Sequence, residues 1–169
     1  MNMNYCMECG TRLVLREHGE EGTVPYCEHC GAFRYPVFNT AVSLLVLDEQ
    51  EEHILLIRQY GRPHFILVAG YVNRGEDAED AARRELREEV GLEALSVRFN
   101  RSRYFPPSNT LMLNFTVTVP TPEVRANREV DAWQWFPLQE AREAIKPGSL
   151  AKAFLTGWLD GAYAFPDYS

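Results

Sequence analysis

The most informative segment of the sequence runs from Gly70 to Leu92 and reads GYVNRGEDAEDAARRELREEVGL. It begins with a glycine-containing loop, and residues 77–90 then predict a helix, because Asp77 suits an N-cap and Gly91 suits the position that ends a helix. Helical residues three and four apart lie on the same side, so the glutamates near the end of this helix project together. These glutamates are Glu85, Glu88 and Glu89.

Carboxylates held close together repel one another unless a cation lies between them. Hard divalent cations such as Mg2+ and Mn2+ take oxygen ligands and bridge carboxylates to the phosphates of a substrate. Arg84 precedes Glu88 by four residues and is expected to hold its carboxylate in place. The alternative is a solvated charged helix with a salt bridge, which does not account for Gly70, Glu76 and the glutamate register together.

The sequence around this helix predicts strands on both sides of it. Residues 41–47 and 53–60 are two apolar runs separated by a charged turn, which predicts a β-hairpin. The other expected elements are strands at 65–68, 95–104, 111–119 and 133–136 and helices at 139–145 and 149–159.

The four cysteines lie within the first 30 residues as two Cys-x2-Cys pairs separated by seventeen residues. This spacing is typical of a zinc ribbon, in which four thiolates complete a tetrahedron around one Zn2+ and leave no open position, so the expected role of zinc is structural. The alternatives are two disulfides in an exported protein or a redox pair, but residues 1–6 lack the regions of a signal peptide. The expected ligands are Cys6, Cys9, Cys27 and Cys30.

The composition is that of a soluble globular protein, with 46% hydrophobic and 24% charged residues. The net charge of −7 argues against broad electrostatic binding to nucleic acid, which usually needs a basic surface. A nucleic-acid-binding ribbon is disfavoured as well, since Arg12, Arg16 and Arg34 are offset by neighbouring glutamates. No apolar run reaches the length of a membrane span. These features predict a cytoplasmic protein that does not bind a membrane.

The stretch Gly70 to Leu92 resembles the Nudix box at every fixed position, and the resemblance extends over nearly the whole chain. It implies an α/β fold of the α+β kind, a Nudix α/β/α sandwich with a mixed sheet at 37–169, preceded by a small zinc ribbon at 1–36. It also implies metal-dependent attack of water on a nucleoside diphosphate linked to another group. Mg2+ or Mn2+ is the catalytic ion implied.

The resemblance implies a role for each polar residue of the box. Glu85 and Glu89 are implied as the main metal ligands, and Glu88 as a ligand or as the base that activates water. Glu76 is implied as a supporting ligand or as a residue that orients Arg84. Two further metal ligands are implied outside the helix, and these are Glu129 and the carbonyl of Ala69.

The order of ribbon, strand and box is similar to that of bacterial NADH pyrophosphatases, which also remove NAD caps from RNA. After the box those enzymes carry a specificity motif, and residues 102–112 keep its ends but differ at several positions. The resemblance implies an aromatic at Tyr71 that stacks on the base. It also implies a second aromatic at Tyr35 that reaches a neighbouring subunit, which is compatible with a homodimer. Core packing is the alternative role for each aromatic. The substrate-binding residues implied are Tyr71, Tyr35, Ser102, Arg103, Phe105 and Ala151.

The activity implied is hydrolysis of NADH or NAD+ to NMN(H) and AMP. ADP-ribose, FAD and the NAD-capped 5′ end of an RNA are alternative substrates, because all of them contain the same diphosphate. A different class of protein would be a catalytically inactive Nudix domain that senses a nucleotide, but retention of every carboxylate of the box argues against it. The expected cofactors are structural Zn2+ and catalytic Mg2+ or Mn2+.

Overall fold

The computed structural model describes residues 3–120 and 123–168. Its backbone contacts divide the chain into two compact units, Met1–Phe38 and Asn39–Ser169. This boundary lies two residues beyond the one expected from the sequence, after residue 36. The four cysteines lie in the first unit, and the acidic helix lies in the second.

The first unit is a three-stranded antiparallel sheet with the strand order β1-β2-β3. Its described buried apolar side chains are Val24, Cys6 and Cys27, and the ring of Phe33 stacks on His18 with centroids 4.0 Å apart. So small a sheet buries little apolar surface, so a cross-link at the cysteines is expected to contribute to its stability. Its elements are β1 (Val14–Glu17), the 3-10 helix η1 (Gly19–Glu21), β2 (Thr23–Cys27) and β3 (Ala32–Phe33).

The second unit is built on a six-stranded sheet with the order β7-β8-β4-β5-β9, and β6 pairs with β4 off this path. Strands β4 and β8 are parallel, whereas the other pairs are antiparallel, including the expected β4–β5 hairpin. The mixed sheet expected from the family resemblance is therefore confirmed. The strands are β4 (Asn39–Leu47), β5 (His53–Gln59), β6 (Val68–Tyr71), β7 (Ser96–Phe105), β8 (Thr110–Thr118) and β9 (Val130–Pro137).

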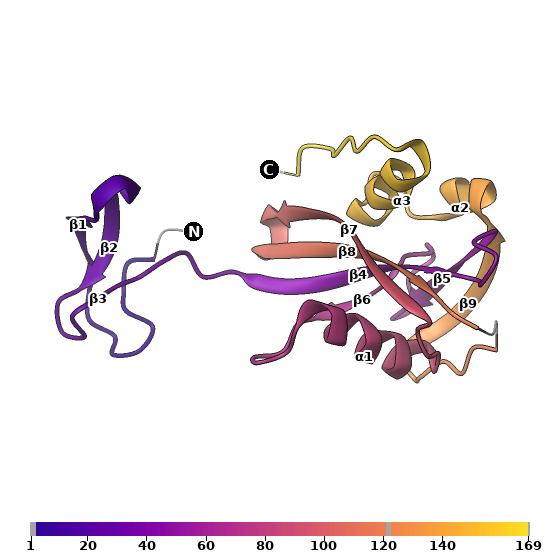
Figure 1. The fold of residues 1–169 in the computed structure, drawn as a ribbon, viewed down its shortest axis with the longest axis horizontal. Helices are drawn as coiled ribbons and strands as arrows, with labels where there is room; N and C mark the ends of the chain where they lie inside the picture. Colours follow the sequence, from indigo (N-terminus) through magenta and orange to yellow (C-terminus); the bar gives the residue numbers. More distant parts are fainter. Residues whose placement is uncertain (1–2, 121–122, 169) are drawn as a thin grey trace. The chain divides into compact units, whose positions relative to one another are not determined.

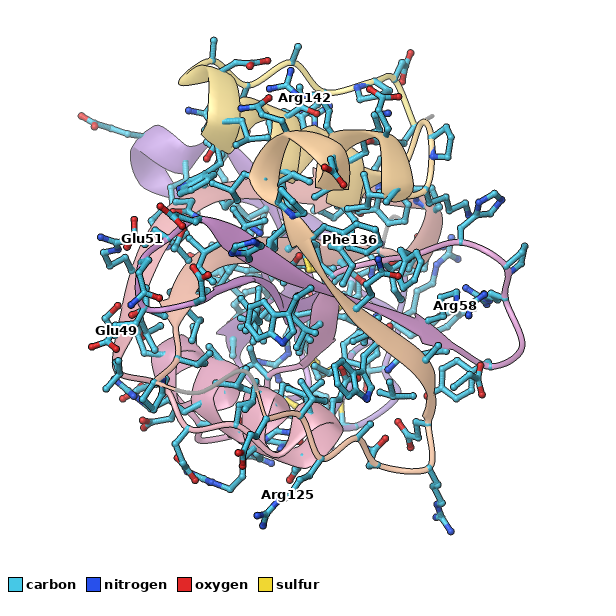
Figure 2. The ribbon with its side chains drawn as sticks, turned by 90° about the vertical axis from the view of Figure 1, so that its right-hand side faces the viewer. Glu49, Glu51, Arg58, Arg125, Phe136 and Arg142 are labelled. Atoms are coloured by element: carbon cyan, nitrogen blue, oxygen red, sulfur yellow. The ribbon has the colours of Figure 1, made fainter. Side chains whose placement is uncertain are left out.

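Helices cover both faces of this sheet (Figure 1). Ala82 and Leu86 of α1 are fully buried against one face, while Leu45 and Phe154 belong to the apolar layer between the other face and α2 and α3. Figure 2 shows Phe136 of β9 beneath α2, where it joins this second layer. Within the described residues, no helix has the length and apolarity needed to cross a membrane. The helices are α1 (Ala78–Val90), α2 (Leu138–Ala144) and α3 (Leu150–Asp160).

Two local expectations differ from the structure. The short strand expected at 65–68 is displaced, because Val68–Tyr71 is the segment that pairs with the start of β4. Helix α1 begins after Asp77 as expected, but the Asp77 side chain makes no capping hydrogen bond. Gly91 ends the helix in the left-handed conformation, with φ of 68°.

Candidate functional site

Strand β6 and helix α1 meet at Gly70. The pairing of β6 with β4 places Gly70 opposite Val42. A Cβ atom on Gly70 would lie 2.0 Å from the carboxyl carbon of Glu85, which is far too close for any side chain. The glycine therefore allows the carboxylate of Glu85 to lie directly against the end of the sheet.

Arg84 holds the acidic side chains around this junction. Its guanidinium donates to both carboxylate oxygens of Glu76, at 2.8 and 3.0 Å, and to the Tyr71 carbonyl oxygen at 2.9 Å. It also donates to Glu85 at 2.6 Å and to Glu88 at 3.0 Å. The paired guanidinium lowers the pKa of Glu76 to about 2. Glu76 thus pairs with Arg84 through both of its carboxylate oxygens, and the expected contact of Arg84 with Glu88 is present.

Glu89 lies in a different environment from the other glutamates of α1. Its side chain is buried, and Gln59 of β5 donates to its Oε1 atom at 2.7 Å. Its Oε2 atom is also buried but has no hydrogen-bond partner among the described residues. Burial raises the pKa of Glu89 to about 7, and the charges of Glu85 and Glu129 act in the same direction. A bound cation would reverse this effect, because it would favour the charged carboxylate.

Glu129 joins this group from the loop before β9. Tyr60 donates its hydroxyl hydrogen to Glu129 at 3.0 Å, and this bond raises the pKa of Tyr60. The backbone N–H of Ala69 lowers the pKa of Glu89, because it favours the charged carboxylate. This effect is opposite to that of burial. The charge of Glu129 and the backbone N–H of Ala69 therefore both act on Glu89.

These residues fit a hard divalent cation such as Mg2+ or Mn2+. They offer several carboxylate oxygens, the charges of Glu85 and Glu129 raise the pKa of Glu89, and one buried oxygen of Glu89 lacks a donor. Glu88 differs, since 57% of its side chain is exposed. Within residues 3–120 and 123–168, the helix carboxylates do not form a cluster as tight as that of the cysteines, because Arg84 and Gln59 hold them.

The four cysteines of the first unit gather around one point. Their Sγ atoms all lie within 4.8 Å of one another, with 3.5 Å between Cys9 and Cys27 and 4.0 Å between Cys6 and Cys30. Sulfur ligands of a tetrahedral zinc ion, with Zn–S bonds of about 2.3 Å, lie about 3.8 Å apart. All four cysteines are free, which excludes disulfides among them in this structure. The cluster is consistent with a structural zinc site.

Electrostatics also favour a cation at the cysteines. Arg34 donates to the Sγ atom of Cys6 at 3.2 Å and lowers the pKa of Cys6 to about 6. The hydrogen bond with Cys9, burial and the neighbouring Cys27 raise the pKa of Cys30 to about 12. Four thiolates would repel one another at this distance, and a central Zn2+ removes that repulsion.

A cavity of about 530 Å³ opens between the sheet and the start of α3. Its lining includes Ala69, the residue whose backbone N–H lowers the pKa of Glu89. Most of the other lining residues are apolar, but Arg62, His64 and Lys146 add basic groups. Among the described residues that line it there is no Asp or Glu, although the chain carries a net charge of −7.

The structure brings some of the expected substrate residues to this cavity and leaves others outside. Phe105 and Ala151 line it, and Tyr71 lines a smaller hollow of about 200 Å³ that shares Ala69 with it. The guanidinium of Arg103 lies 5.2 Å from the ring centroid of Phe165, so it faces the C-terminal segment. Ser102, on β7, also lies outside the cavity lining. Tyr35 belongs to the first unit, where it donates to Glu21 at 3.0 Å.

A family model described as NUDIX domain matches residues 37–156. The chain belongs to the Nudix family. The match covers the whole of the sheet, α1 and the first half of α3. The geometry around Gly70, Arg84 and Glu89 is therefore the geometry of a Nudix box.

Curated relatives of this Nudix protein include NAD-capped RNA hydrolases. The chain is 33% identical over 161 residues to "NAD-capped RNA hydrolase NudC" of Pseudomonas aeruginosa, covering 92% of this chain and 55% of the relative. It is 31% identical over 148 residues to "NAD-capped RNA hydrolase ndx-9" of Caenorhabditis elegans, covering 83% of this chain and 38% of the relative. The chain thus spans about half or less of the length of these relatives.

Solved structures support the Nudix fold at lower identity. A NUDIX hydrolase from Nitrosomonas europaea matches with a TM-score of 0.59 and 21% identity, covering 97% of each chain. The dihydroneopterin triphosphate pyrophosphohydrolase of E. coli matches with a TM-score of 0.61 and 19% identity, covering 75% of this chain and 100% of that chain. At this level of identity the likeness concerns the fold alone.

Several contributors to the Nudix site were not predicted from the sequence. Gln59 holds Glu89, Tyr60 holds Glu129, and Ser43 lines the cavity. Ser43 offered an available signal, since it is a polar residue within a run of apolar residues, whereas Gln59 follows Arg58 at the end of its strand. A polar side chain in a buried strand needs a partner, and that partner often belongs to a functional site.

Gly70→Ala is expected to lower kcat/KM for the Nudix substrate by about 10–100-fold, the range typical of residues that position metal ligands. The new Cβ atom would force Glu85 away from β6, so the variant should also require more Mg2+ or Mn2+ for half-maximal activity. Steady-state kinetics across a metal titration measure both effects. Gly161→Ala is the control, because Gly161 ends α3 with a φ of 68°, so alanine strains the backbone there, but the space around it is open and no carboxylate is displaced. Wild-type metal dependence in Gly70→Ala would contradict the assignment of Glu85 as a ligand.

Proposed function

We propose that this Nudix domain hydrolyses the diphosphate of NADH or NAD+ and releases NMN(H) and AMP. The observation that carries the proposal is the carboxylate arrangement on α1, with Glu85 against Gly70 and a buried oxygen of Glu89 without a partner. Carboxylates of this kind bind Mg2+ or Mn2+ together with substrate phosphates. Similarity to NAD-capped RNA hydrolases supports the choice of an NAD-type dinucleotide.

Each acidic residue has a separate task in this proposal. Glu85 and Glu89 hold the cation, with Glu129 and the Ala69 carbonyl as further ligands beside them. When bound, the cation polarises a phosphoryl oxygen and lowers the pKa of the attacking water. Arg84 keeps Glu85 in position through its bond of 2.6 Å.

Glu88 is the proposed proton acceptor. Its carboxylate is largely exposed and so within reach of water, whereas the free oxygen of Glu89 is buried. Arg84 occupies one oxygen of Glu88 and leaves the other available for the proton of the attacking water.

The cavity supports a dinucleotide as the substrate. Its apolar lining, with Phe105 and Phe154, suits a planar base, and its basic groups suit phosphates. NAD-capped RNA contains the same diphosphate and carries additional phosphates along its chain. The basic residues in the cavity lining are Arg62, His64 and Lys146. Because they suit additional phosphates, capped RNA is the second candidate substrate.

A hydrolysis panel tests the proposal. The full chain is incubated with NADH, NAD+, ADP-ribose, FAD and NAD-capped RNA in Mg2+ or Mn2+, and the products are separated by ion-exchange chromatography. NADH is expected to yield NMNH and AMP with a kcat/KM at least about tenfold above that of ADP-ribose or FAD. A reversed ranking of that size would overturn the substrate and leave the family intact. Nucleotide binding without turnover in either metal would instead indicate a sensing module.

A further inference from the structure

Ser43 is a polar residue in an apolar layer. It lies in β4, where alternation places it on the same face as Leu45 and Leu47, both of which pack beneath α2 and α3. Only 4% of Ser43 is exposed, yet it lines the cavity together with Phe105 and Met112. Burial of a hydroxyl is unfavourable unless the group is hydrogen-bonded, so this serine requires an explanation.

Asn114 satisfies one side of the Ser43 hydroxyl. The two residues are paired in register between β8 and β4, and the Nδ2 atom of Asn114 donates to the carbonyl oxygen of Ser43 at 3.0 Å and to its Oγ atom at 3.4 Å. Asn100 of β7 donates to the Oδ1 atom of Asn114 at 2.9 Å, which fixes the direction of the amide. Oγ is therefore an acceptor toward Asn114, and its hydrogen has no acceptor among the described residues.

We propose that Ser43 determines specificity by donating this hydrogen to the edge of a base seated in the cavity. The apolar side chains around it, such as Phe105 and Met112, suit a flat ring. The hydroxyl of Ser43 in the cavity lining would favour a ring that has a hydrogen-bond acceptor on its edge. A dinucleotide of the NAD type offers two such rings, through the carboxamide oxygen of nicotinamide and the ring nitrogens of adenine. The inference rests on the proposed function for the identity of the dinucleotide.

Ser43→Ala tests the role of the hydroxyl. The variant is expected to raise KM for NADH about tenfold with little change in kcat, since the lost bond is made in both the ground state and the transition state. ADP-ribose distinguishes the two rings because it lacks nicotinamide. An unchanged KM for ADP-ribose assigns the cavity to nicotinamide, and an equal rise assigns it to adenine. An unchanged KM for both substrates would overturn the proposal.

Thr116→Val is the matched control. Thr116 is buried in the same network, donating to the Oδ1 atom of Asn100 at 3.0 Å, but it is not part of the cavity lining. The Thr116→Val variant should have a lower melting temperature than the wild type but an unchanged KM for NADH. An equal rise in KM in both variants would show that Ser43 acts only through the stability of the network. Ser43→Cys keeps the size of the side chain with a weaker donor, so an intermediate KM is expected even if the alanine variant folds poorly.

Binding without turnover separates this proposal from the proposed function. Calorimetry of NADH with Glu89→Gln, with and without Ser43→Ala, reports on the cavity alone. A roughly tenfold weaker binding in the double variant supports the role of Ser43 even if the wild type hydrolyses none of the dinucleotides. Equal binding by the two proteins would overturn that role, whatever the wild type hydrolyses.

Discussion

Glu89→Gln is expected to lower kcat by on the order of 10³-fold while leaving the fold intact. Glutamine is nearly isosteric and can still accept the hydrogen bond from Gln59, but it removes a negative charge that a hard cation requires. The effect should persist at saturating Mg2+ and Mn2+, because the charge is missing and not merely displaced. Steady-state kinetics with the substrate that the panel identifies measure it.

The same substitution is expected to change how stability depends on pH. Burial raises the pKa of Glu89 to about 7 in the folded chain, above the value of about 4.3 in an unfolded chain. A carboxyl group with a raised pKa binds its proton more tightly in the folded chain. Its contribution to the free energy of unfolding is therefore present at low pH and is lost as pH rises from about 4 to about 7. Without added Mg2+ or Mn2+, Glu89→Gln should therefore melt at a higher temperature than the wild type at pH 8, and the two should converge near pH 4.

Glu79→Gln is the matched control for both measurements. Glu79 lies in the first turn of the same helix but is exposed. It should change neither kcat nor the pH dependence of melting. Near-wild-type turnover in Glu89→Gln would contradict the placement of the metal centre on α1.

Cys6→Ala is expected to remove zinc from the protein and to unfold the first unit. Zinc binding to sites of this type contributes about 10 kcal/mol or more to folding, and the small sheet has few buried apolar residues to replace that contribution. Zinc content measured by elemental analysis should fall from roughly one ion per chain to near zero. Hydrogen exchange should show lost protection in residues 3–38 but not in β4 to β9, and kcat should change far less than in Glu89→Gln.

His29→Ala is the matched control for the zinc prediction. Its Nδ1 atom lies 3.9 Å from the Sγ atom of Cys30, yet it is not part of the cysteine cluster. The variant should therefore retain its zinc. A Cys6→Ala protein that still binds one zinc ion, or wild-type protein that contains none, would contradict the assignment.

Features that depend on short-range geometry could be predicted from the order of the residues alone. A helix places residues three and four apart on one side, so the register of Glu85, Glu88 and Glu89 and the contact of Arg84 with Glu88 followed from spacing alone. Each Cys-x2-Cys pair likewise keeps its two thiols close through short spacing, and the seventeen intervening residues contain β1, η1 and most of β2, two of the three strands of the small sheet. The β4–β5 hairpin also followed from neighbouring residues.

The environment of each functional side chain, by contrast, depends on how the chain folds. The glutamates of α1 share a register, but Glu89 is buried against Gln59 while Glu88 is exposed, because the packing of α1 on the sheet selects which of them faces inward. Arg103 faces Phe165, and Ser43 enters the cavity, because strand pairing and the layers above it set the surroundings of each side chain. These contacts join residues that are far apart in the chain, and local spacing carries no information about such pairs.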